Sequence, residues 1–149
     1  MTDRIEFSRM DIYDLLHDDR TFDVVLFLGV FYHLRYPLLA LDMLVPKVKQ
    51  WMLFQTMLLP SAVEFETPYD LDFDDRAMLE SPGWPSMAFI EQRFAGDPTN
   101  WWVASRSGIE AMLRSSGFTV EKEICREFYL CKPAQPSPWA AKTLDNLRT

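Results

Sequence analysis

The sequence predicts an α/β fold with a mostly parallel sheet and a C-terminal antiparallel hairpin. Apolar runs typical of strands alternate with helical patterns, in the order strand, helix, strand, insertion, helix, strand, strand. The last two strand patterns follow each other closely enough to pair antiparallel. Ligands of such sheets bind outside the carboxyl ends of the strands, so residues that follow a strand are the first candidates for a site.

Composition and charge indicate one globular domain. The 149 residues are 48% hydrophobic, which is enough for a buried core. The net charge of −7 and scattered basic residues do not give the basic face typical of proteins that grip nucleic acid. Cys125 and Cys131 are too few for a disulfide framework or a zinc site. Without an apolar run of membrane length or a signal-peptide core, we expect a reduced, cytoplasmic protein with no membrane partner.

The first half of the chain carries three strand patterns and one helix pattern. Residues 4–9 alternate polar and apolar side chains and predict a short strand, followed by a loop or helical turn in MDIYDLL. The continuous apolar run at 22–29 predicts a strand covered on both faces. Pro37 suits the first turn of a helix that Pro46 would end, and residues 51–58 predict the next strand.

The second half begins with a long insertion at 59–104, rich in proline, for which we expect one or two short helices and a functional role. A helix follows, with Ser107 and Glu110 as an expected capping box and Gly117 as its C-terminal cap. Residues 118–124 and 127–132 predict the terminal hairpin. The expected tail is loose until a short final helix.

An acidic run in the insertion has calcium-loop spacing at Asp70, Asp72 and Asp74. A calcium loop requires glycine at its sixth position, where this chain has Asp75. We therefore expect a solvated acidic loop and no metal site.

Several segments resemble class I S-adenosylmethionine-dependent methyltransferases. FDVVLFLGVFYHLRYPLLAL resembles their fourth strand and the loop after it, and MDIYDL lies at the spacing of the acidic loop beside the adenine. NWWVASRSGIEAMLRSSGFTVEKEI and REFYLCKP resemble the later helix and the sixth and seventh strands. The strings G-V-x-Y-H-x-R and W-x-x-x-S…L…GF are most similar to the enzymes that modify the wobble uridine of tRNA with carboxylated S-adenosylmethionine. The resemblance covers most of residues 5–133.

One departure from that family concerns glycine. Family members carry a glycine-rich loop after their first strand, but the five glycines here, at 29, 83, 96, 108 and 117, do not form G-x-G-x-x-G. The resemblance therefore implies a partial Rossmann-like sheet with the first strands missing. Residues 1–133 would be a truncated methyltransferase-like domain and 134–149 a loose tail.

The resemblance also implies cofactor-binding residues. Asp11 would accept from the adenine amino group, Ile12 would pack on the ring, and Gly29 and Val30 would present backbone to the methionine moiety. From the residues alone, Asp11 equally suits a helix N-cap, and Gly29 suits a strand end that needs an unusual φ.

Tyr32 and His33 are the expected catalytic residues. The tyrosine would lie beside the transferable group, and the histidine would act as a base or fix the loop. Each residue type also serves as a half-buried structural side chain with satisfied polar atoms. Arg35 and Arg126 would bind a carboxylate or phosphate of the substrate.

Two functions follow. The first is methyl or carboxymethyl transfer from S-adenosylmethionine or its carboxylated derivative to an O, N or C nucleophile, on RNA or a small molecule, with the fragment inactive alone. The second is a non-catalytic, methyltransferase-like association module. Without the family's first strand, the apolar strand at 22–29 has an open edge, which predicts a homo-oligomer formed through that edge.

Overall fold

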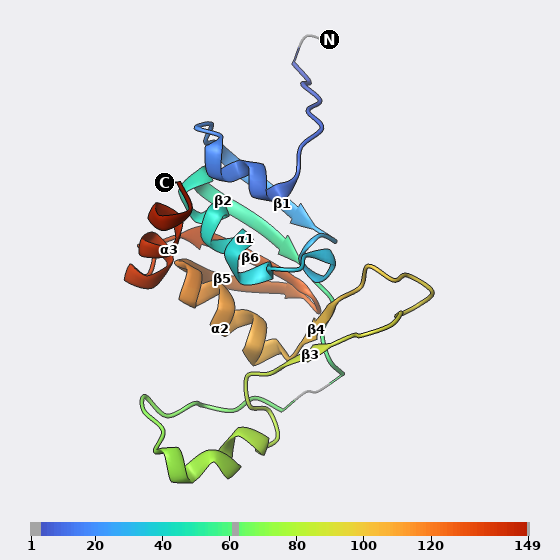
Figure 1. The fold of residues 1–149 in the computed structure, drawn as a ribbon, viewed down its shortest axis with the longest axis vertical. Helices are drawn as coiled ribbons and strands as arrows, with labels where there is room; N and C mark the ends of the chain where they lie inside the picture. Colours follow the sequence, from blue (N-terminus) through green and yellow to red (C-terminus); the bar gives the residue numbers. More distant parts are fainter. Residues whose placement is uncertain (1–3, 61–62, 149) are drawn as a thin grey trace.

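The computed structural model describes residues 4–60 and 63–148, and its centre is a four-stranded sheet in the order β1-β2-β6-β5 (Figure 1). β1 and β2 pair in parallel, whereas β2–β6 and β6–β5 pair antiparallel, so three of the four strands share one direction. This mixed sheet with its antiparallel C-terminal hairpin confirms the predicted α/β class. The strands are β1 (Phe22–Leu28), β2 (Val48–Gln55), β5 (Phe118–Cys125) and β6 (Phe128–Pro133).

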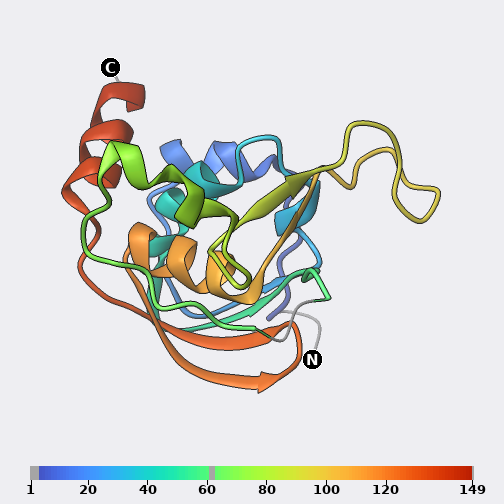
Figure 2. The same cartoon turned by 90° about the horizontal axis from the view of Figure 1, so that it is seen from below.

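The helices lie together on one side of this sheet (Figure 2). Side chains of β2 and β6 that point toward the helices, such as Phe54 and Tyr129, are completely buried, and Leu41 and Leu113 cover them from the helix layer. The core is therefore a single sheet-on-helix layer. The helices are α1 (Pro37–Leu44), α2 (Arg106–Ser116) and α3 (Pro138–Arg148), with short 3-10 helices η1 (Ile12–His17), η2 (Phe31–His33) and η3 (Val45–Lys47).

β1 is a half-covered edge strand, and the expectation that it is covered on both faces is wrong. Phe27 points into the core, but Val24 and Leu26 on the opposite face are 56% and 66% exposed. Among the described residues no strand pairs with the outer edge of β1, and no helix lies against its exposed face. A run that is apolar at every position except Asp23 therefore forms a strand whose second face is open here.

The strand predicted at residues 4–9 does not form, although its side chains alternate as expected. This segment is an extended arm that leaves the body of the molecule (Figure 1), with Ile5 68% and Phe7 93% exposed. The physical reason is that a strand needs a partner for its backbone, and none of the described strands lies beside the arm.

The other element boundaries match the sequence with small shifts. α1 begins at Pro37 and ends before Pro46, as predicted, whereas β2 begins and ends three residues earlier than expected. The expected capping box is wrong: Ser105 caps α2 by accepting from the Gly108 N–H at 3.1 Å. Gly117 ends α2 in the left-handed region at φ +106°, as predicted.

The insertion is mostly irregular and returns to the sheet through a short ribbon. Its single helical segment among the described residues is the 3-10 helix η4 (Phe73–Glu80), within the predicted one or two. β3 (Met87–Phe89) and β4 (Trp102–Ala104) then pair antiparallel, and the loop between them projects from the body (Figure 1).

The tail has no regular structure at 134–137 and then carries α3, the final helix expected from the sequence. Its Ala140 and Leu144 are buried, and Leu144 joins the main core. None of the helices in the described ranges is long and apolar enough to cross a bilayer.

Candidate functional site

The candidate site lies at the carboxyl end of β1, where the chain leaves the sheet. Gly29 has φ +69°, a left-handed conformation that glycine adopts without steric cost. Its N–H points to the carbonyl of Gln55 at 3.4 Å, which extends the β1–β2 ladder by one step. The backbone then turns directly into η2, which carries Tyr32 and His33.

A cavity of about 260 Å³ lies between this turn and the start of η1. The structure brings together three of the four residues expected to bind a cofactor: Asp11 at the N-cap of η1, Ile12 at its first position, and Val30 after β1. Apolar side chains make most of the wall, and one carboxylate stands among them. The remaining lining residues are Met10, Leu15 and Phe27.

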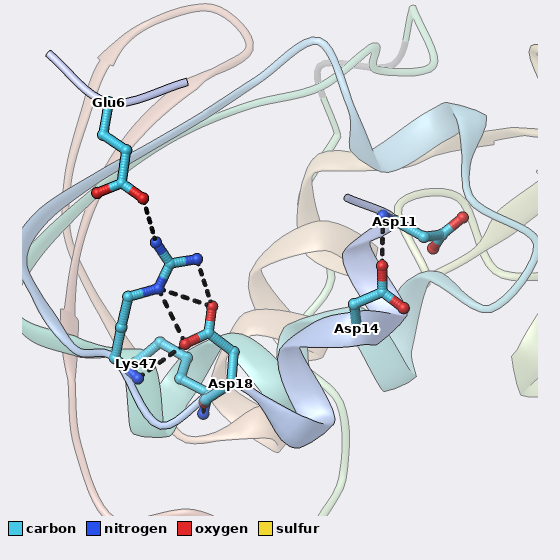
Figure 3. A network of polar contacts seen from close by, with 6 residues as sticks. Glu6, Asp11, Asp14, Asp18 and Lys47 are labelled. Atoms are coloured by element: carbon cyan, nitrogen blue, oxygen red, sulfur yellow. Dashed lines mark hydrogen bonds and ion pairs between the residues drawn. The ribbon is translucent and has the colours of Figure 1, made fainter. Parts of the chain in front are cut away.

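Asp11 caps η1, so the helix-cap alternative from the sequence is confirmed. One carboxylate oxygen accepts from the Tyr13 N–H at 3.0 Å, and the Asp11 N–H donates to Asp14 at 2.8 Å (Figure 3). The Asp11 side chain also accepts from the Asp14 N–H, which completes a capping box. The cap therefore fixes this carboxylate at the edge of the cavity.

The far end of η1 is fixed by a charged network (Figure 3). Asp18 accepts from the Arg20 guanidinium at 2.7 Å, and the Asp18 carbonyl accepts from Lys47. Hydrogen bonds from Arg20 lower the pKa of Asp18 to about 2. Glu6 approaches the same guanidinium at 3.6 Å. The segment that carries Asp11 and Ile12 is thus held at both ends.

Tyr32 and Gln55 place two polar tips above Gly29. A Cβ built on Gly29 would lie 3.4 Å from the Tyr32 hydroxyl and 3.8 Å from the Gln55 side-chain oxygen. Sequence reasoning missed Gln55. The available signal was a polar residue ending the apolar strand that is the parallel neighbour of β1, with Leu28 and Gln55 in register.

His33 is oriented by the insertion. Its Nδ1 lies 2.9 Å from the Thr99 hydroxyl and 3.1 Å from the Thr99 carbonyl. A carbonyl only accepts, so the geometry assigns the proton to Nδ1 and leaves Nε2 as an acceptor. The Thr99 hydroxyl in turn donates to Asp97 at 2.7 Å. Hydrogen bonds from Thr99 lower the pKa of Asp97.

Arg35 rests on aromatic rings of the β3–β4 ribbon. Its guanidinium carbon lies 4.3 Å from the Trp101 ring centroid and 5.9 Å from that of Phe89. The Trp102 indole N–H donates to the Leu34 carbonyl at 3.1 Å. Trp101 and Trp102 therefore support the loop that follows η2.

Arg126, the second expected substrate-binding arginine, lies elsewhere. It occupies the exposed turn between β5 and β6, on the far side of β2 from β1. Nothing in the described structure joins it to Tyr32, His33 or Arg35. Within the described residues no group of acidic, histidine or cysteine side chains is suited to hold a metal ion, and Asp72 of the acidic run caps η4.

The fold resembles that of a domain solved with S-adenosylhomocysteine. A crystal structure of the N-terminal domain of EvdMO1 in the presence of SAH and D-fucose matches with a TM-score of 0.50 at 17% identity, over 85% of this chain and 53% of that one. A second structure of that domain, with SAH bound, matches at 0.45 and 18%, over 85% and 50%. No protein-family model and no curated protein matches the chain. The fold is thus like that of part of the EvdMO1 domain. The chain spans about half the length of the structures it matches.

Proposed function

We propose that this chain carries the nucleoside pocket and the acceptor-side wall of an S-adenosylmethionine-dependent methyltransferase. The observation that carries the proposal is the cavity at the carboxyl end of β1, lined by Asp11, Ile12 and Val30. In the sequence, those residues lie in the segments that resemble the cofactor-binding loops of that family. The likeness of the fold to a domain solved with SAH gives independent support.

The cavity suits one part of the cofactor. Complete small-molecule sites measure roughly 300–1,000 Å³. The cavity here holds about 260 Å³, which fits the flat base better than the whole molecule. Ile12 and Val30 offer apolar surface for the faces of a ring, and the Asp11 carboxylate, whose oxygens have further lone pairs, can accept from an exocyclic amine.

The wall beyond Gly29 suits the acceptor. S-adenosylmethionine, when bound, supplies a methyl group on a positively charged sulfur that a nucleophile attacks in line. His33, with its proton on Nδ1, can take a proton from the acceptor atom at Nε2. The Tyr32 hydroxyl and Gln55 amide can orient that atom by hydrogen bonds. Methyl transfer depends mainly on such positioning.

The proposal also concerns which acceptor is modified and which group is transferred to it. The branch that the sequence resembles transfers a carboxymethyl group to tRNA, whereas the EvdMO1 structure was determined in the presence of D-fucose. A small molecule suits this chain better than tRNA, because the net charge is −7 and nucleic-acid binding depends on basic surfaces. We therefore propose methyl transfer to a small molecule. Methyl transfer to tRNA, and carboxymethyl transfer from a carboxylated cofactor, are the alternatives that an activity assay would distinguish from it.

We also propose that the chain alone binds the cofactor weakly and does not turn over. The sequence has no glycine-rich motif to cradle the methionine part, and the outer edge of β1 pairs with no described strand. A complementary segment along that edge would complete the site.

Nuclear magnetic resonance titration tests the pocket. SAH and adenosine should shift the Asp11, Ile12 and Val30 amides with similar affinities, and homocysteine should not. Ile12→Ala should weaken both ligands by about threefold to tenfold, because a ring contact of roughly 1 kcal/mol is lost. Ile5→Ala, on the exposed arm, is the matched control. Shifts confined to other regions, or equal binding by I12A, would refute the proposed pocket.

A second candidate function is association without catalysis, which the exposed apolar side chains of β1 favour. Absence of SAH binding together with a stable dimer would support it over the enzyme.

A further inference from the structure

Arg35 is held by two aromatic rings, whereas Arg76, whose guanidinium carbon also lies 4.3 Å from a ring centroid, has one such ring, that of Phe73. The guanidinium carbon of Arg35 lies 4.3 Å from the Trp101 ring centroid and 5.9 Å from the Phe89 centroid, and the two rings are within 8° of parallel. Contacts of this kind fix a flat cation without using its N–H donors. The donors at the edge of the guanidinium therefore remain available.

No carboxylate within the described chain neutralises Arg35. Arg20, Arg106 and Arg114 all have acidic partners, as expected in a chain with 22 acidic residues. Arg35 is exposed and has only its aromatic contacts. Aromatic support without an internal anion is the arrangement of an arginine prepared for an anion from outside.

The position of Arg35 connects it to the proposed acceptor wall. It follows His33 by two residues, and its ring partner Trp101 follows Thr99, the partner of His33, by two. The Trp101 N–H donates to the Tyr32 carbonyl at 2.8 Å, so the two segments run side by side. A molecule that contacts His33 from this wall has Arg35 within reach of a neighbouring substituent.

We propose that Arg35 binds an anionic group of the acceptor, a carboxylate or a phosphate, and that the substrate is therefore an anionic small molecule. This inference rests on the proposed methyl transfer for the word acceptor, but the anion site itself stands on the contacts above. A guanidinium offers paired donors that match the oxygens of either anion, with more directional specificity than a lysine ammonium. Phe89, 50% exposed, supplies apolar surface beside the charge.

The test is a titration of the whole chain with benzoate, phenyl phosphate and neutral benzyl alcohol at constant ionic strength. The signals to follow are the Arg35 Nε–H and the Trp101 indole N–H. Benzoate or phenyl phosphate should shift both, and the stronger of the two identifies the anion, whereas benzyl alcohol should shift neither. Arg35→Gln should weaken anion binding about tenfold, the value of one charge-assisted contact.

Two variants sharpen the result. Arg93→Gln removes the same charge from the exposed loop between β3 and β4 and should leave anion binding within about twofold of the unmodified chain. Arg35→Lys keeps the charge without the paired donors, and should recover less than half of the lost affinity on a logarithmic scale. Equal anion binding by R35Q and the unmodified chain, or equal losses in R35Q and R93Q, would overturn the proposal.

The titration omits SAH, so its failure is distinct from failure of the proposed function. If the chain binds no SAH but binds the anion through Arg35, the proposed methyltransferase function is rejected and the proposed anion site at Arg35 is supported. If SAH binds at Ile12 and Val30 but R35Q binds the anion as tightly as the unmodified chain, only the proposal for Arg35 is rejected.

Discussion

Thr99 holds the imidazole of His33 across 66 positions of sequence, with its hydroxyl 2.9 Å and its carbonyl oxygen 3.1 Å from Nδ1. This contact joins the turn after β1 to the far end of the insertion. The same two segments meet again where Trp102 donates to the Leu34 carbonyl. The insertion is therefore part of the candidate site, and changes within it should be felt by His33.

Removing the Thr99 hydroxyl should alter the tautomer of His33. Thr99→Val keeps the branched shape, but it breaks the hydrogen bonds of the hydroxyl with His33 and Asp97. We expect the Nδ1-protonated form to decline toward the mixture of an exposed histidine, and the free energy of unfolding to fall by about 1 kcal/mol. Nitrogen-15 shifts of the ring measure the tautomer. Thr119→Val, at an exposed position of β5, is the control, and an unchanged ring in T99V would contradict the assignment.

Gly29→Ala should separate backbone strain from a local effect on the site. Gly29 and Gly96 have φ values of +69° and +79°, so alanine at either position should destabilise the fold by about 1 kcal/mol. Only at Gly29 does the new methyl group meet the Tyr32 hydroxyl, because nothing lies within 4 Å of a Cβ at Gly96.

We therefore expect Gly29→Ala to weaken SAH binding by about fivefold and Gly96→Ala to leave it unchanged, as measured by titration of each variant. Similar SAH affinities in the two variants, despite equal losses of stability, would show that the turn at Gly29, which leads into Val30, does not shape the cofactor site.

The Asp18–Arg20 pair should contribute to stability in a defined pH range. The folded pKa of Asp18 is about 2 and the ordinary value is 3.8, so the folded state favours the carboxylate. The contribution is present above pH 4 and is lost as the pH falls toward 2. Asp18→Asn should therefore lower the thermal midpoint at pH 7 and have no effect near pH 2. Asp19→Asn controls for net charge, and a D18N effect that persists undiminished at pH 2 would contradict this account.

The open edge of β1 predicts a homo-oligomer, which remains our proposal for the partner of this chain. Leu26 is 66% exposed on this strand, and apolar edge strands pair readily with another chain. We expect a dimer in sedimentation at micromolar concentration, and Leu26→Lys should convert it to a monomer. Leu79→Lys, at an exposed position of η4, should not. A monodisperse monomer of the unmodified chain would refute the expectation.

The sequence predicts those parts of the fold that depend on residues close together in the chain. Pro37 and Gly117 mark helix ends because proline fits a first turn and glycine a left-handed cap, and both predictions hold. Residues 4–9 fail because strand formation needs a partner that no local pattern reveals. Ser105, and not Ser107, caps α2, because Ser107 instead donates to the Gly83 carbonyl, a contact 24 positions away.

The candidate site follows the same division. Asp11, Ile12 and Val30 line one cavity because the loops that carry them adjoin the end of β1. Gln55, Thr99 and Trp101 could not be found, because their roles depend on strand register and on the path of a long irregular insertion. Contacts between neighbouring strands, or between such a loop and the sheet, join residues that are distant in sequence. A local sequence pattern therefore does not predict them.

The most direct test of the central claim is calorimetric titration of the chain and of Val30→Asp with S-adenosylhomocysteine. The account predicts one-to-one binding by the unmodified chain, weakened at least tenfold by V30D, because a carboxylate would stand where the wall of the cavity is apolar. No heat from the unmodified chain, or equal affinity in the folded variant, would contradict the claim that the cavity at the end of β1 binds the nucleoside.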